Sequence, residues 1–162
     1  MTKYLLKNTD GSGLYLVGDL SYLFEQQEWL QLLDRGFRTD ESGIYHHREH
    51  QVFLCSTGTD GYHHLYEDGE QKDTVPVDTA SIGLMPWDLA SETVGFEWND
   101  DLSEEENFEL QEKLLMTHHY VYESEEDIEI EVKEDFIIID QSLYILRIHG
   151  QLKEFDGTLR FD

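Results

Sequence analysis

Three aspartates at glycine-containing turns are the residues of this sequence best placed to do chemistry. Asp19 follows a glycine, Asp60 precedes one, and Asp78 opens a turn after an apolar segment. Each ends or follows an expected strand, and such positions can converge at one edge of a sheet. Converging carboxylates would bind a divalent cation, or raise one another's pKa values enough for acid–base catalysis. The competing interpretation is that each aspartate caps its own turn through bonds to nearby backbone groups.

Histidine is a common metal ligand, but the spacing of the histidines does not form a compact metal motif. His46 and His50 would lie about 13 Å apart along a strand, too far apart to share one metal ion. In each adjacent pair a strand would direct the two rings to opposite faces. We therefore expect ordinary sheet and surface histidines. The pairs are His46-His47, His63-His64 and His118-His119.

The segment from Asn8 to Asp19 imitates a calcium-binding loop. Asn8, Asp10 and Ser12 alternate as oxygen donors, Gly13 takes the sixth position, and Asp19 takes the twelfth. The usual first Asp and last Glu of such loops are replaced, and the flanking segments are strand-like. A hairpin turn is therefore the favoured interpretation.

The signatures of other enzyme classes are absent from the sequence. There is no nucleophile elbow, phosphate-binding P-loop, dinucleotide-binding glycine motif or zinc-protease motif. An enzyme is therefore the less favoured class. No cofactor is expected, apart from a divalent cation at the three aspartates.

The charge is strongly acidic and concentrated. The chain has a formal net charge of −25 over 162 residues, and residues 100–135 contain 15 acidic and two basic residues. Such a surface repels nucleic acid and anionic membranes and attracts basic protein surfaces, which a DNA mimic would exploit. The alternative is a merely solvated surface. The candidate partner-binding residues are Glu104, Glu105, Glu106, Glu109, Glu129 and Glu131.

Three functional hypotheses remain. The favoured one is an acidic protein-binding module that presents these glutamates to a basic partner. The second is a small metal-assisted hydrolase that uses Asp19, Asp60 and Asp78 with His63 or His64. The third is a structural or regulatory interaction domain of unassigned role, for which a self-complementary apolar patch or an edge strand that mediates a homodimer would be the sign. The tyrosines that would contribute to that patch are Tyr62, Tyr66, Tyr120 and Tyr122.

Short glycine- and aspartate-containing turns carry a resemblance over about residues 13–86. The segments 14–19, 57–62 and 77–83, together with Ser21-Tyr22 and Trp29, resemble a group of small bacterial and phage-associated proteins. The resemblance implies no activity. The chain differs from that group at residues 20–21, where Pro-Cys is common, and at Ala80, where glycine is common.

Composition predicts one folded domain, residues 1–162, of the α+β class. Hydrophobic residues make up 39% of the chain, which is enough for a substantial core at this length. The single cysteine, Cys55, lies in an apolar run and is expected to be a buried thiol. No signal segment or membrane span is visible, so we expect a cytoplasmic protein.

The elements that must position these residues are mostly antiparallel strands with two helices. Helices are predicted at about 21–35 and 103–116, the second from a capping box between Ser103 and Glu106. Residues 1–20 predict a β-hairpin, and residues 127–149 predict an antiparallel meander whose central strand is 136–139. Further strands are expected at 44–48, 51–56, 62–67, 74–77, 81–85 and 94–98, with an edge at 158–161.

Overall fold

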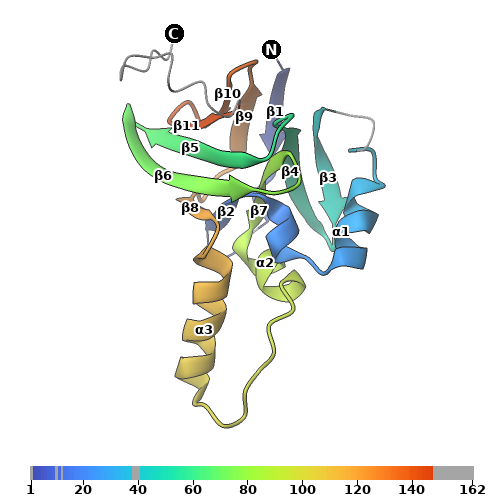
Figure 1. The fold of residues 1–162 in the computed structure, drawn as a ribbon, viewed down its shortest axis with the longest axis vertical. Coiled ribbons are helices and arrows are strands. Elements are labelled where there is room, and N and C mark those ends of the chain that lie inside the picture. The colour runs from blue at the N-terminus through green and yellow to red at the C-terminus, as the bar shows by residue number, and fades with distance from the viewer. Residues whose placement is uncertain (1, 10, 12, 38–40, 148–162) are drawn as a thin grey trace.

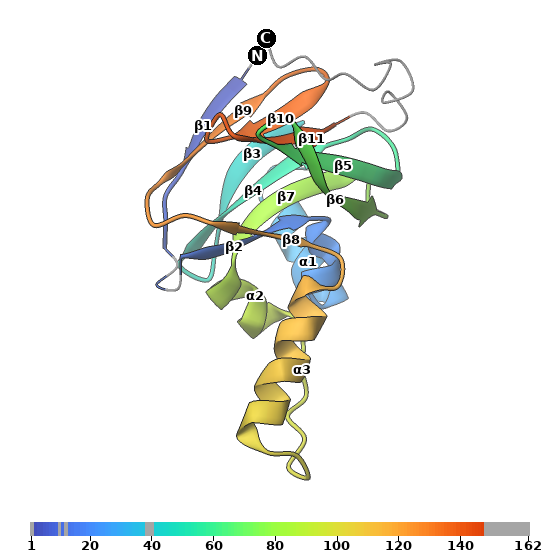
Figure 2. The same ribbon diagram turned by 90° about the vertical axis from the view of Figure 1, so that its left-hand side faces the viewer.

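The computed structural model describes residues 2–9, 11, 13–37 and 41–147, which form two packed antiparallel sheets (Figures 1 and 2). The six-stranded sheet has the order β1 (Thr2–Leu6), β9 (Ile128–Val132), β10 (Phe136–Ile139), β11 (Leu143–Leu146), β5 (Gly61–Glu67) and β6 (Glu70–Val77). The five-stranded sheet has the order β3 (Ser42–His47), β4 (His50–Ser56), β7 (Ser81–Pro86), β2 (Leu14–Gly18) and β8 (Tyr120–Glu123). The predicted α+β class with mostly antiparallel sheet is confirmed.

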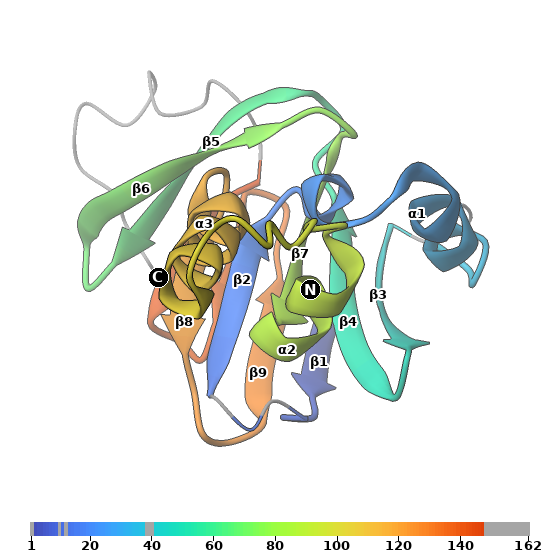
Figure 3. The ribbon, with the colours of Figure 1, turned by 90° about the horizontal axis from the view of Figure 1, so that it is seen from below.

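The helices lie on the outer side of the five-stranded sheet, as the view from below shows (Figure 3). They are α1 (Gln26–Leu33), α2 (Trp87–Thr93) and α3 (Glu104–Met116), with a 3₁₀ turn at Leu20–Leu23. The helix α3 projects away from both sheets, and only Asn107 and Leu115 of its residues are buried. None of the described helices is long and apolar enough to cross a membrane.

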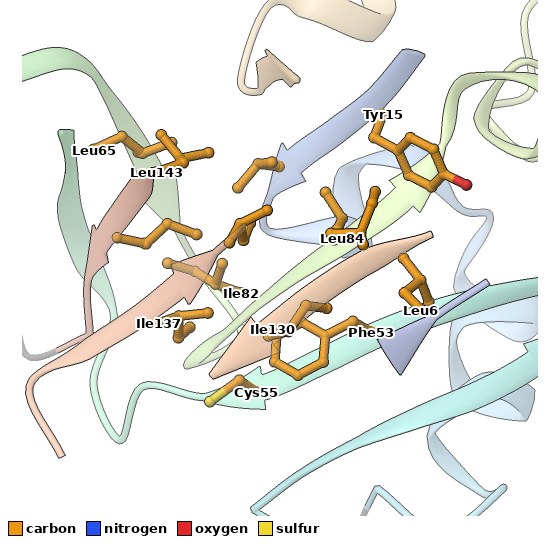
Figure 4. Close-up of a cluster of buried hydrophobic side chains, with 14 of the residues drawn as sticks. Leu6, Tyr15, Phe53, Cys55, Leu65, Ile82, Leu84, Ile130, Ile137 and Leu143 are labelled. Carbon is orange, nitrogen blue, oxygen red and sulfur yellow. The ribbon is translucent and has the colours of Figure 1, made fainter. Parts of the chain in front are cut away.

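Alternation along the strands explains the layers. In β4, Phe53 and Cys55 face the core between the two sheets, whereas Val52 and Leu54 face the helices. In β10, Ile137 and Ile139 face the same inter-sheet core, which Figure 4 shows in close-up. Because successive side chains of a strand point to opposite faces, a continuous apolar run contributes side chains to the apolar clusters on both faces of its sheet. Cys55 is fully buried as predicted, and burial raises the pKa of its thiol to about 11.

The predicted hairpin over residues 1–20 is wrong. β1 pairs with β9 in the six-stranded sheet, whereas β2 pairs with β7 and β8 in the other sheet. The glycine-rich segment between them therefore carries the chain from one sheet to the other. Turn-forming residues predict that the chain changes direction but do not determine which strands pair.

Two predictions, one of a helix and one of a strand, need correction. The predicted helix at 21–35 is interrupted at Phe24, whose extended backbone (φ −127°, ψ 150°) separates the 3₁₀ turn from α1. The predicted strand at 94–98 is wrong, because the chain leaves α2 after Thr93 and stays irregular up to the start of α3. The helix at 103–116 is confirmed, including the reciprocal capping box of Ser103 and Glu106.

The predicted C-terminal meander is confirmed, and β10 lies between β9 and β11 as its central strand. The last strand of this meander, β11, ends at Leu146. Residues 148–149 of the predicted meander lie outside the described residues. The expected edge at 158–161 lies outside the described residues.

Candidate functional site

The three predicted aspartates meet at the turn between β6 and β7. Asp19 Oδ2 accepts hydrogen bonds from the backbone N–H groups of Asp78 (2.7 Å) and Thr79 (2.9 Å). Asp60 Oδ1 accepts one from the backbone N–H of Ala80 (2.8 Å). Side chains from two distant turns therefore accept hydrogen bonds from the same three-residue segment, 78–80.

The carboxylate of Asp19 is fully buried and its hydrogen-bonding capacity is filled. Its Oδ1 accepts a bond from the backbone N–H of Ser21, which caps the 3₁₀ turn, and one from the hydroxyl of Thr79, both at 3.0 Å. With the two bonds to Oδ2, four donors match the roughly four lone-pair sites of an ionised carboxylate. This geometry is that of a structural carboxylate that ties two segments together.

Asp78 points toward the surface and contacts Tyr22. The hydroxyl of Tyr22 donates a short hydrogen bond to Asp78 Oδ2, and the Tyr22 ring lies 4.6 Å from that of His118 between centroids. Burial first, and then the bond to Asp78, raise the pKa of Tyr22. A tyrosine held in its protonated form can donate a hydrogen bond but is a poor base at neutral pH.

His119 is buried next to Asp19, and its ring lies between two backbone carbonyl groups. Its Nε2 is 3.0 Å from the backbone oxygen of Asp19, and its Nδ1 is 3.1 Å from that of Leu115. Burial lowers the pKa of His119, and the two backbone bonds oppose that shift. The ring joins the end of α3 to the aspartate cluster, which is a structural contact.

The described residues contain no group of three His, Cys, Asp or Glu side chains that could hold a metal ion. His47 contacts Glu28 (2.7 Å), and His64 contacts Thr74 (2.8 Å). In the calcium-like segment, Asp10 and Ser12 lie outside the described residues. The side-chain amide of Asn8 donates to the backbone oxygens of residues 124 and 126, so it fastens this segment to the loop after β8.

The six predicted acidic residues lie on two separate elements. Four belong to α3, whereas Glu129 and Glu131 belong to β9 at the opposite end of the molecule (Figures 1 and 2). Glu131 forms an ion pair with Lys3 (3.5 Å). None of the ion pairs found in the described part of the chain includes a carboxylate of α3. Those carboxylates are Glu104, Glu105, Glu106, Glu109 and Glu112, all exposed.

The four tyrosines considered for a dimer patch do not share one exposed face. Tyr62 is 65% exposed, but Tyr66 is buried. The hydroxyls of Tyr120 and Tyr122 donate to Glu67 (2.9 Å) and Asp140 (2.5 Å), so both rings serve contacts inside the molecule.

Sequence reasoning missed a buried side-chain amide that holds the preceding segment against the N-terminal end of α3. Asn107 is fully buried, its Oδ1 accepts from the backbone N–H of Asn99 (2.9 Å), and its Nδ2 donates to the Asn99 oxygen (2.9 Å). The neighbouring Trp98 packs edge to face against Phe108, with ring centroids 5.5 Å apart. The signal was present in the sequence, because Asn107 shares a helix face with Leu115.

No family model, curated protein or solved structure matches this chain. The two candidate regions differ in what they can still bind. The hydrogen-bonding groups around Asp19 are satisfied within the molecule, whereas α3 presents exposed carboxylates and exposed apolar side chains together.

Proposed function

We propose that the protein is a binding module that engages a basic partner protein through the outer face of α3. The observation that carries this proposal is the set of exposed carboxylates on α3, a helix that stands away from the two sheets (Figures 1 and 2), none of which forms an ion pair with another described residue. At 100° per residue, Glu105, Glu109 and Glu112 lie on the side of the helix opposite the buried Asn107. These carboxylates are therefore presented outward.

The electrostatics favour a cationic partner. Only Lys113 in α3 opposes five glutamates, so the helix carries a local excess of negative charge. Such a field repels nucleic acid and accelerates encounter with a basic surface over roughly 10 Å at about 0.1 M salt. Charge on the partner would thus determine both encounter rate and orientation.

The proposed contact does not extend to β9. An elongated DNA-like array would have to join α3 to Glu129 and Glu131, which lie at the far end of the molecule, where Glu131 already pairs with Lys3. A hydrolytic metal site at Asp19, Asp60 and Asp78 has less support, because the oxygens of Asp19 are filled by protein donors. We place the contact in the cytoplasm, in keeping with one buried thiol and no disulfide framework.

The test is affinity capture from a lysate of the source organism with the full-length protein as bait. We expect basic proteins to be retained at about 50 mM salt and released at about 300 mM, because exposed charges are screened within about a Debye length. Added DNA should compete for those that bind nucleic acid. The triple variant Glu105→Gln, Glu109→Gln, Glu112→Gln should no longer retain the basic proteins.

A second triple variant provides the matched control. Glu123→Gln, Glu125→Gln, Glu126→Gln removes the same charge from exposed positions at the end of β8 and in the loop that follows it. Retention by this control but not by the α3 variant supports the proposal. Equal retention by both variants, or the absence of any basic protein, would count against it.

A further inference from the structure

We infer that the Trp98–Phe108 pair at the N-terminal end of α3, the end far from the two sheets, is the recognition site for an arginine or lysine side chain of the partner. This inference rests on the proposed function and names the chemistry that the partner must present. The two rings come from the segment before α3 and from its second turn, and they pack at 84° with centroids 5.5 Å apart. Trp98 is 48% exposed and Phe108 is 57% exposed.

The pair is held in place before any partner arrives. Asn107 bonds both backbone groups of Asn99, the residue next to Trp98, and its Nδ2 also donates to the oxygen of Ser103 (3.0 Å). Ser103 and Glu106 cap the helix, so the positions of its first two turns are defined. A site whose geometry is already fixed loses less conformational entropy on binding.

Both rings keep accessible surface in addition to their mutual contact. An edge-to-face pair covers only one of its four ring faces by that contact, and about half of each side chain is exposed. Exposed tryptophans are enriched among the residues that dominate protein interfaces. The face of an aromatic ring attracts a cation, most strongly when the ring is Trp.

The surrounding charges select a cation over an apolar or acidic group. Glu104, Glu105 and Glu112 stand four and three residues before Phe108 and four residues after it, which makes them its neighbours on the helix surface. All three are exposed, and no described ion pair includes them. A guanidinium stacked on an indole could also bond these carboxylates, which favours arginine over lysine.

A second copy of this chain does not fit the same site. The chain carries a net charge of −25, and the only basic residue of α3 is Lys113. Two copies meeting at this face would bring their carboxylates together in a desolvated contact. Charge complementarity therefore points to a basic segment of another protein.

The test uses two fluorescently labelled dodecapeptides of equal charge, one alternating arginine with glycine and one alternating lysine with glycine. Binding to the full-length protein is followed by anisotropy at about 50 mM and about 200 mM salt. We expect the arginine peptide to bind more tightly. Trp98→Ala and Phe108→Ala should each raise its Kd about two- to fivefold.

Two further variants separate the contributions. Trp98→Leu keeps apolar bulk but removes the ring face, so it should weaken binding of the arginine peptide nearly as much as Trp98→Ala. Leu114→Ala, an exposed apolar residue outside the site on the same helix, should leave the Kd unchanged. Circular dichroism establishes that each variant keeps its helix content.

The outcomes distinguish this inference from the function on which it rests. If all aromatic variants bind as the wild type does, while Glu105→Gln with Glu112→Gln weakens salt-dependent binding, the aromatic site is overturned and the acidic module stands. If Trp98→Leu binds as tightly as the wild type, the ring face plays no part and the inference fails. If the wild type binds neither peptide in a salt-dependent manner, the proposed function fails too.

Discussion

At the scale of single residues, Asp19 is a buried carboxylate that forms no ion pair with another described residue. Two backbone amides of the β6–β7 turn, one of the 3₁₀ turn and the hydroxyl of Thr79 surround it. Hydrogen bonds to an ionised acceptor are stronger than neutral ones, which offsets the loss of hydration. Asp19 therefore connects the end of β2 to the turn between β6 and β7 through hydrogen bonds.

Replacing Asp19 by alanine should lower the free energy of unfolding by about 3 kcal/mol or more. Hydrogen bonds to a carboxylate contribute about 1.5–3 kcal/mol each, and the amides of Asp78 and Thr79 would both lose one. Urea denaturation measures the change. Asp60→Ala is the matched control, because it removes a single bond from an exposed side chain and should cost about 1 kcal/mol. Equal losses from the two variants would contradict this role of Asp19.

His119 makes the stability depend on pH. Burial lowers its pKa in the folded protein, whereas in the unfolded chain the pKa returns to about 6.5. Between those two values the unfolded chain binds more protons, so stability is fully present above about pH 6.5 and is lost as the pH falls toward the folded value. His118 and Asp19 are the neighbouring titratable groups.

The measurement is urea unfolding of the wild type and of His119→Gln at about pH 7.5 and about pH 5.5, on either side of the ordinary histidine pKa. The wild type should lose more stability between these two pH values than the variant does. An equal loss in both proteins would mean that other groups produce the pH dependence.

The chemistry of the aspartates was predictable only in part, and their convergence was not. Each stands at a turn, but the capping interpretation holds only for the bond from the Ser21 backbone N–H to Asp19, because Asp60 bonds the backbone N–H of Ala80 in another turn. Asp19 and Asp78 are 59 residues apart, and the pairing of β2 with β7 brings them together. That pairing depends on which apolar faces pack, which no short motif encodes.

At the scale of elements, signals contained within a few residues were reliable. The capping box of α3 and the alternation of β9 each involve near neighbours, and both occur as predicted. The first hairpin failed because β1 and β2 have partners more than 100 residues away, in β9 and β8. The apolar residues Phe108, Leu110 and Leu114 of α3 remain exposed, and at 100° per residue Phe108 and Leu110 lie on nearly opposite sides of the helix.

Gly83 marks a place where β7 can accept no side chain. A Cβ there would lie 2.3 Å from the backbone oxygen of Phe53 and 2.6 Å from Leu20 Cδ1. Gly83→Ala should therefore destabilise the domain by about 3 kcal/mol, at the upper end of the usual overpacking cost. Thermal unfolding measures this, with Gly11→Ala as the control, because nothing lies within 4 Å of a Cβ at Gly11. A variant as stable as the wild type would show that β4 and β7 can move apart.

At the scale of the whole molecule, the negative charge that would attract a basic partner must also oppose folding. A net charge of −25 is large for 162 residues, and self-repulsion in a compact state lowers stability. The ion pairs among the described residues involve acids of β6, β9, α1 and α2 together with Glu41, and none involves an acid of α3. A basic partner would relieve this repulsion, so binding and stability should respond to salt in opposite directions.

We therefore expect the free energy of unfolding to rise by about 1 kcal/mol or more between about 20 mM and about 500 mM KCl, as screening shortens the range of repulsion. Chloride is preferred to sulfate, because sulfate also strengthens apolar burial. The variant Glu105→Gln, Glu109→Gln, Glu112→Gln should show a smaller rise, since it starts with less repulsion. Stability that falls with added KCl would mean that favourable ion pairs outweigh repulsion. The acidic surface would then be part of the domain's own stabilisation, with less negative charge left for a partner.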